Sequence, residues 1–327
     1  MKALITGASG FIGSHLVDLL LARGYSVRVL LRTTSSLEWL QDQRLEHVYG
    51  DLSDVQALRS AVEGVDYVYH LAGTTRAKSA EEYFRANQQG TRNLLATVKD
   101  HAAHLQRFVH ISSQTAVGPS PTATPIDETA PAKPLTNYGK SKWGAELECH
   151  QFFQHFPLTI VRPPAVFGPR DRDIFNFFST LNKGLLPIVG FSDKYISLIH
   201  SADLVRGFVQ AGESQKSIGE TYFIASARPY TWKEIGDIAS RLAGKRVLRV
   251  RVPELLAYAV AAVAEGLALF SAKPALLNFE KTRDMVQDYW TCDSSKATRD
   301  FGYRQEMSLE EGMRDTLQWY RAHGWLT

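Results

Sequence analysis

Residues 4–20, LITGASGFIGSHLVDLL, decide the fold of this 327-residue chain. Three glycines, Gly7, Gly10 and Gly13, follow a short apolar run and enter a segment with helical periodicity. At this spacing, between a strand and a helix, glycines let the backbone turn tightly, approach a pyrophosphate and pack the helix on the sheet. The N–H groups that begin the helix then face the phosphates. The stretch therefore predicts dinucleotide binding, with purely structural glycines as the alternative.

Outward from this turn, apolar runs alternate with helical patterns through the first half of the chain. The alternation is typical of α/β proteins with a doubly wound parallel sheet of the Rossmann type, whose ligand crevice lies at the carboxyl ends of the strands. The continuous apolar character of the runs suits strands that helices cover on both faces. The expected strands are 2–6, 26–32, 45–51, 66–72, 107–113 and 158–168, and the expected helices are 11–23, 54–62 and 81–100.

After about residue 170 the alternation becomes irregular. We expect residues 1–170 to form the dinucleotide-binding Rossmann domain, with segments near 195–225 returning to it. Residues 171–327 are expected to form a smaller, interleaved α/β lobe that binds the substrate. Its expected strands are 185–189, 195–200 and 221–225, and its expected helices lie near 201–212, 231–243, 254–270 and 308–323.

Composition and charge exclude some classes of function. A net charge of +3, without a run of lysines or arginines, gives no indication of nucleic-acid binding. Cys149 and Cys292 match no metal-ligand spacing, and the ten histidines show no metal pattern. Two packed thiols predict a reduced, cytoplasmic protein without a metal site. The strand expected from Lys2 leaves no room for a signal peptide, which favours the same compartment.

Segment 254–270 is strongly apolar, but its apolar run of 16 residues contains Glu265 and Gly266. A helix that spans a membrane needs about 20 apolar residues. We therefore expect a helix that packs on the protein or covers a substrate pocket, and no stable membrane insertion. Contact with a membrane surface and an oligomer interface are the alternatives.

The end of the second expected strand bears on which dinucleotide is bound. An acidic residue there would bind the adenosine ribose of NAD, but this chain has VRVLLRTTSS, with Arg32 at that place. An arginine can pair with a 2′-phosphate, which predicts NADP, while NAD stays possible and a solvated arginine is the alternative. Asp51 is placed to accept a hydrogen bond from the adenine amino group, or else to cap the following helix.

Residues 136–148, TNYGKSKWGAELE, place Tyr138 and Lys142 one helical turn apart on one face. Alone, such a pair occurs by chance in many proteins. Together with the glycine turn, however, it resembles the extended form of the short-chain dehydrogenase/reductase superfamily, the NAD(P)-dependent epimerases and dehydratases. The resemblance covers most of the chain, through GDLSD, HLAG, ANQQGTRNLL, ISSQTAVGP, YGKSK, RPPAVFGPRD and LIHSADLV.

The resemblance implies a catalytic set of Ser113, Tyr138 and Lys142, with Ser112 as the alternative serine. The tyrosine would exchange a proton with the substrate oxygen while hydride moves to or from the nicotinamide, and the lysine and nicotinamide charges would favour its phenolate. A homodimer through the helices near 81–100 and 137–155 is also implied. The implied cofactor-binding residues are Gly7, Ser9, Gly10, Phe11, Ile12, Gly13, Arg32, Asp51, Leu52, Ala72, Gly73, Tyr138, Lys142, Pro163 and Val166.

Two departures from the family pattern concern the substrate. Sugar-nucleotide epimerases and dehydratases carry an Asn where this chain has Ala165, and an arginine that grips the pyrophosphate where it has Ile196. Lys194 and Arg170 are the candidate substitutes for that arginine. The motifs are closer to the dihydroflavonol reductase and 3β-hydroxysteroid dehydrogenase branches, which handle bulky, weakly polar alcohols and ketones.

Three functions therefore compete. The first is an NADP-dependent oxidoreductase that interconverts a secondary alcohol and a ketone on a bulky, weakly polar small molecule. The second is a sugar-nucleotide epimerase or dehydratase that retains its NAD(P). The third is a non-enzymatic dinucleotide sensor, although such proteins tend to lose the tyrosine or lysine that this chain keeps.

Overall fold

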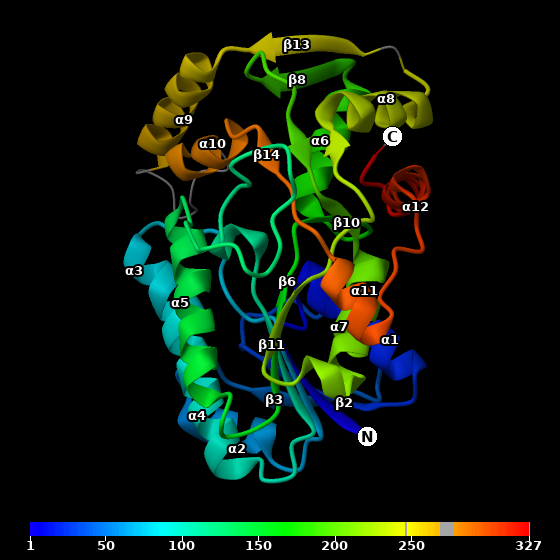
Figure 1. Cartoon of the computed structure of the whole chain (residues 1–327). Helices are drawn as coiled ribbons and strands as arrows, with labels where there is room; N and C mark the ends of the chain where they lie inside the picture. The colour runs from blue at the N-terminus through cyan, green and yellow to red at the C-terminus, as the bar shows by residue number, and fades with distance from the viewer. Residues whose placement is uncertain (246, 269–277, 327) are drawn as a thin grey trace.

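The computed structural model describes residues 1–245, 247–268 and 278–326. Seven parallel strands form a central sheet in the order β11-β6-β5-β4-β1-β2-β3, which confirms the expected doubly wound α/β fold (Figure 1). The strand order reverses next to β1, where the glycine turn lies, so the ligand crevice opens at that point. The strands are β1 (Lys2–Thr6), β2 (Ser26–Leu31), β3 (Glu46–Tyr49), β4 (Tyr67–His70), β5 (Arg107–Ile111), β6 (Leu158–Arg162) and β11 (Glu220–Phe223).

Helices cover both faces of this sheet and create two separate apolar cores. Side chains alternate along each strand, so Ala3 and Ile5 of β1 join one core and Leu4 joins the other. The first core lies under α1 and α7, and the second lies under α2, α4 and α5. The bounds are α1 (Phe11–Ala22), α2 (Val55–Val62), α4 (Gly90–His101), α5 (Asn137–Phe152) and α7 (Ser201–Glu213).

Two expected strands are each divided in the structure, so their prediction as single strands was wrong. The run 158–168 ends as β6 at Arg162, because Pro163 and the next proline have no N–H group for a strand ladder. Beyond them, β7 pairs with β10 in a separate two-stranded sheet. The run 195–200 divides at Ser197 into β9 and β10, which belong to different sheets. The new elements are β7 (Ala165–Phe167), β9 (Tyr195–Ile196) and β10 (Leu198–His200).

The helix expected at 81–100 is also not uniform. It begins as α3 (Ala80–Tyr83), widens into a π-helical stretch over Phe84–Gln89 and continues as α4. Such π-helical widenings are rare and occur frequently at functional sites. This one faces the cavity described below.

The second half of the chain builds a lobe above the carboxyl ends of the sheet strands (Figure 1). Its own core includes Phe178, Leu186, Ile235 and Leu317. Strand β11 returns to the central sheet, whereas the division into cofactor and substrate domains stays a prediction. The remaining elements are α6 (Arg172–Asn182), β8 (Leu185–Val189), β12 (Tyr230–Thr231), α8 (Trp232–Ala243), β13 (Leu248–Val252), α9 (Glu254–Ala268), α10 (Phe279–Met285), β14 (Tyr289–Trp290), α11 (Ser295–Phe301) and α12 (Leu309–Ala322).

Helix α9 corresponds to the apolar segment expected at 254–270, whose last two residues lie outside the described part of the chain. Ala257 and Ala261 are buried, but large apolar side chains such as Leu255 (82% exposed) face outward. Among the described residues, we find no helix with both the length and the apolar character needed to cross a membrane.

The glycine turn has no room for side chains. Gly7 has a φ of 76°, a conformation that favours glycine, and a Cβ atom there would lie 2.7 Å from the Ala72 nitrogen. A Cβ atom on Gly13 would lie 2.2 Å from the Gly7 carbonyl oxygen. Glycine is therefore required at position 13 by the close contact of α1 with the turn, and at position 7 by the backbone conformation and the approach of the loop after β4.

We predict that Gly13→Ala lowers the free energy of unfolding by about 1–3 kcal/mol, because the methyl group overpacks the turn. Urea unfolding measures the change. The matched control is Gly266→Ala on α9, where an added Cβ atom meets no described atom within 4 Å. The control should be neutral or stabilising by up to about 1 kcal/mol. Equal unfolding midpoints for Gly13→Ala and the unchanged protein would contradict the close approach.

Candidate active site

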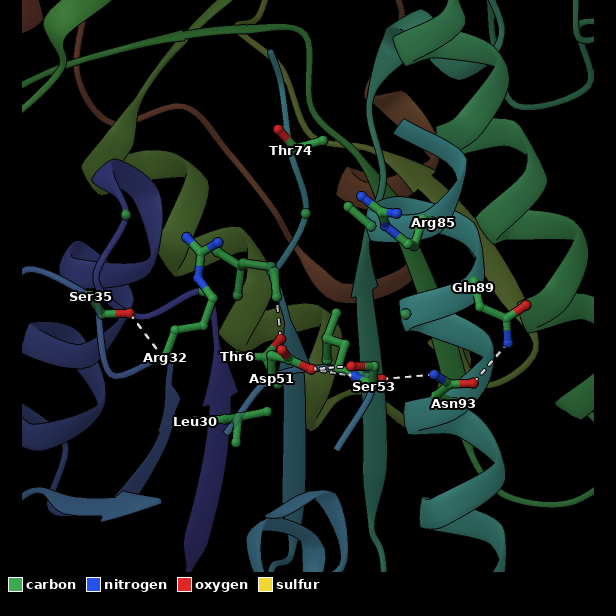
Figure 2. Close-up of a pocket in the computed structure, with 18 of the residues that line it drawn as sticks. Thr6, Leu30, Arg32, Ser35, Asp51, Ser53, Thr74, Arg85, Gln89 and Asn93 are labelled. Carbon is green, nitrogen blue, oxygen red and sulfur yellow. Dashed lines mark hydrogen bonds between the residues drawn. The ribbon is translucent and has the colours of Figure 1, made fainter. Parts of the chain in front are cut away.

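A cavity of about 670 Å³ opens at the carboxyl ends of β1, β2 and β4 (Figure 2). Part of its wall is backbone, from the glycine turn and the loop that follows β4. No side chain caps the first turn of α1 and no acidic residue lies in it, so its N–H groups are available to phosphates. Eight predicted cofactor residues line the cavity: Gly7, Ser9, Gly10, Arg32, Asp51, Leu52, Ala72 and Gly73.

Polar groups at one end of the cavity suit the adenosine half of a dinucleotide. The Asp51 carboxylate accepts hydrogen bonds from the Ser53 N–H (2.7 Å) and hydroxyl (2.6 Å), which hold its pKa below the usual value. Asp54, not Asp51, caps α2. Arg32 forms no ion pair with any described residue, so its guanidinium is available to an anion.

Sequence reasoning missed the wall that faces Arg32. Figure 2 shows Arg85 on the side opposite Arg32, where the π-helical stretch turns its side chains to the cavity. Thr74 and Arg76, from the loop after β4, also line the space. The recognised motif ANQQGTRNLL begins at Ala86, directly after Arg85, so it did not include this arginine. Arg76 pairs with Asp173 of α6, so this wall reaches the lobe.

Tyr138 lies in the first turn of α5, where the Thr136 hydroxyl caps the helix by accepting the Gly139 N–H. Burial raises the pKa of Tyr138 to about 12, a hydrogen bond with Ser113 acts in the opposite direction, and Tyr83 and Asp284 raise it further. These residues therefore hold the tyrosine as a neutral phenol at neutral pH.

Lys142 is buried one turn further along α5. Its ammonium group donates to the Ile111 carbonyl (2.6 Å) at the end of β5. Burial lowers its pKa to about 8, against the charge of Glu146. The sequence predicted that this lysine lowers the tyrosine pKa. The protein residues alone do not produce that effect, because the ammonium is bound to a carbonyl and burial of the phenol dominates.

The two adjacent serines have different surroundings. Ser112 is buried and its hydroxyl donates to Glu146, which forms an ion pair with Arg162 of β6 through three hydrogen bonds of 2.6 to 3.2 Å. Ser113 is half-buried, interacts with Tyr138, and accepts hydrogen bonds from the Thr115 N–H and hydroxyl. The structure thus brings Ser113, Tyr138 and Lys142 together and leaves Ser112 in a buried polar network.

The remaining predicted cofactor-binding positions do not line the cavity. The Pro163 carbonyl accepts the Gln114 N–H (2.8 Å), which holds the end of β6 beside the serine segment. Val166 lies in β7, and Phe11, Ile12 and Gly13 lie in the first turn of α1. Ser113, Tyr138 and Lys142 are also absent from the cavity lining. Helix α10 contacts the start of α5 beside Tyr138.

Both candidate substitutes for the missing pyrophosphate-binding arginine are bound elsewhere. The Lys194 ammonium is buried and donates to the Val286 carbonyl (2.6 Å). Arg170 pairs with Asp18 of α1 (2.7 Å) and its guanidinium lies over the Trp39 ring (5.2 Å). Both cations are thus engaged with protein groups and neither lines the cavity, although the Arg170 Nη1 atom is buried without a hydrogen-bond partner among the described residues.

Comparisons with known proteins agree with this site. The model of the NAD dependent epimerase/dehydratase family matches residues 3–225. The ceramide reductase of Caulobacter vibrioides is 28% identical, over 98% of this chain and 95% of its own length. The 3-beta-hydroxysteroid dehydrogenase of Mycolicibacterium neoaurum is 28% identical, over 98% and 91%. A putative dihydroflavonol 4-reductase of Synechocystis is 27% identical, over 98% and 95%.

Among solved structures, the UDP-glucuronic acid 4-epimerase of Bacillus cereus, in complex with NAD and a UDP-sugar, superposes with a TM-score of 0.81 and 25% identity. The match covers 99% of this chain and 100% of that one. The expected kind of cofactor, a nicotinamide dinucleotide, agrees with the family and with this neighbour. The chain therefore belongs to the NAD dependent epimerase/dehydratase family and is an enzyme of the extended short-chain dehydrogenase/reductase type.

Proposed function

We propose that the protein is an NADP-dependent reductase that converts a ketone on a bulky, weakly polar small molecule into a secondary alcohol. The observation that carries this proposal is the engagement of Lys194 and Arg170 with protein groups. A sugar nucleotide carries a diphosphate, which needs a cationic partner on the substrate side. Ala165 and Ile196, at the family's asparagine and arginine positions, are unable to replace that partner.

NADP is the cofactor that suits the adenosine end of the cavity. Arg32 forms no ion pair within 4 Å with a described residue, although its charge contributes to the lowered pKa of Asp51. The main-chain N–H of Arg32 donates to the Ser35 hydroxyl (3.1 Å), which brings a second polar group to the same edge. A 2′-phosphate would meet a guanidinium and a hydroxyl there. NAD lacks this phosphate and would leave the arginine unpaired.

The protonation state of Tyr138 supports the reductive direction. The reduced nicotinamide, when bound, supplies the hydride. Tyr138, as a neutral phenol, donates its proton to the substrate oxygen, and Ser113 donates a hydrogen bond to the same oxygen. The Lys142 ammonium lies one helical turn from Tyr138 and donates a hydrogen bond to the Ile111 carbonyl. With a pKa of about 8, it keeps a positive charge near neutral pH.

The lobe supports an apolar substrate. Helix α9 packs on α10, where Tyr258 stacks on Phe279, and α10 in turn covers the end of α5 that carries Tyr138. The outward face of α9 exposes Leu255 and Val263. Two relatives are named for ceramide and for hydroxysteroids, which are bulky and largely apolar.

The proposal also includes a homodimeric assembly and a cytoplasmic location. We expect a homodimer through the surface of α4 and α5, on which Leu147 is 45% exposed. Cys149 and Cys292 are buried free thiols, as expected for a reducing, cytoplasmic compartment.

The function is tested by measuring NADPH oxidation with a panel of steroid and long-chain acyl ketones, while UDP- and GDP-sugars are tested for binding. We expect turnover of some ketones and its loss in Tyr138→Phe, which retains cofactor binding. Tight sugar-nucleotide binding without ketone turnover would instead favour an epimerase or dehydratase.

Arg32→Asp should weaken NADPH binding by about 10- to 100-fold, because a charge-assisted hydrogen bond is lost and a repulsion is added. NADH binding should change by less than about threefold, since NADH has no 2′-phosphate. Fluorescence titration of both cofactors measures the effect. Arg44→Asp, an equal change of charge outside the cavity lining, is the control. Equal weakening of NADH and NADPH by Arg32→Asp would remove the 2′-phosphate assignment.

The adjacent serines provide a matched pair. Ser113→Ala should lower kcat by about 100-fold with an unchanged melting temperature, as for loss of one donor to the reacting oxygen. Ser112→Ala should instead destabilise the protein by about 1–3 kcal/mol, since a buried hydrogen bond to a charged group is lost, with a smaller effect on kcat. Calorimetry and steady-state kinetics separate the two effects, and the reverse pattern would make Ser112 the substrate-binding serine.

A further inference from the structure

Helix α10 is bound to the segment that carries Tyr138. The Glu280 carboxylate accepts the Asn137 N–H (2.7 Å) at the start of α5, and the Arg283 guanidinium donates to the Leu135 carbonyl (3.2 Å). These contacts join residues far apart in the sequence. They bring the C-terminal half of α10 to the tyrosine end of the active site.

Asp284 stands out on this helix. Its Oδ1 atom is buried, and no described residue donates a hydrogen bond to it. A buried polar oxygen without a partner costs about 1–3 kcal/mol, and more when it is charged. Such a group in a native structure requires an explanation.

Neighbouring charges do not satisfy this carboxyl group. On α10 itself the neighbouring charges are Glu280, Lys281 and Arg283, and the Arg283 guanidinium donates a hydrogen bond to the Leu135 carbonyl. From α5, the nearby titratable group is the Tyr138 phenol, whose pKa Asp284 raises. Burial, followed by Glu280, raises the pKa of Asp284 to about 7.

The fold does not use the Asp284 side chain. The hydrogen bond that links this position to β14 runs from the Trp290 indole N–H to the main-chain carbonyl of Asp284 (2.8 Å), which any residue would provide. The side chain is therefore free to serve a ligand. Asp284 lies one helical turn beyond Glu280, which contacts Asn137 next to Tyr138, so a ligand that reaches both Asp284 and Tyr138 has its polar group close to the reacting oxygen.

We propose that Asp284 binds the substrate by accepting a hydrogen bond from a hydroxyl or amide N–H group next to the ketone that Tyr138 protonates. The inference rests on the proposed function, because it assigns the substrate class of the same site: bulky ketones that carry a hydrogen-bond donor near the carbonyl. A ketone without this donor leaves the buried carboxyl group unpaired and binds less well.

The test uses two ketones that differ in one hydroxyl group, 2-hydroxy-2-methylpropiophenone and isobutyrophenone. Calorimetric titration of the NADP-saturated enzyme measures binding without turnover, and NADPH oxidation measures reduction. The hydroxyketone should bind about 10-fold or more tightly than its partner, as expected for one hydrogen bond to a charged group.

Asp284→Leu and the isosteric Asp284→Asn should reduce this preference, to within about twofold for the leucine variant, while binding of isobutyrophenone is kept. If Asp284 had only a structural role, its variants would weaken the binding of both ketones equally. The control is Asp288→Asn, which changes a carboxylate that already has partners in Ser192 and Lys194. This control should keep the preference.

The proposal is overturned if the unchanged enzyme binds the two ketones equally or binds neither, or if both Asp284 variants keep the preference. The failure of the proposed function is a separate result. If the preference in binding depends on Asp284 but no ketone consumes NADPH, the substrate contact stands and the reductase assignment falls.

Discussion

A buried ion pair between Glu146 and Arg162 fixes the helix on which the active site depends. Three hydrogen bonds join the two side chains, and Ser112 adds a fourth to the carboxylate. Removing one partner of such a pair leaves a buried charge, whereas the complete pair locks α5 against β6. Because Tyr138, Lys142 and Glu146 are spaced by one helical turn, fixing the glutamate also fixes the height and rotation of the lysine and tyrosine.

The electrostatics of the site follow from burial more than from pairing. Burial lowers the Lys142 pKa and raises the Tyr138 pKa, so both groups are held away from their usual values in opposite directions. A protonated phenol suits proton donation to a ketone oxygen. On the cofactor side, Arg32 lines the cavity and the first turn of α1 has no side-chain cap, so both offer positive groups to the phosphates.

Local patterns were sufficient to predict the glycine turn and most strands of the sheet, because these depend on neighbouring residues. The Tyr138–Lys142 pair was singled out by the resemblance of the whole chain to a family, since its spacing alone also occurs by chance. The two prolines that end β6 after Arg162 are visible in the sequence, but the strand was nevertheless expected to continue to residue 168. The π-helical stretch, the engagement of Lys194 and the approach of Asp284 to Tyr138 were not predictable. They arise from contacts between distant segments, such as the docking of α10 on α5, and local patterns carry no information on them.

Transfer of deuterium tests the central claim, net reduction of a substrate ketone, most directly. The enzyme is given a ketone with NADPH that carries deuterium at both positions of the nicotinamide C4, and the released product is analysed by mass spectrometry. We predict one deuterium in each alcohol formed and one NADP⁺ for each product. The account would be contradicted if no ketone took up deuterium, while a UDP- or GDP-sugar supplied in a parallel reaction was altered without net oxidation of NADPH.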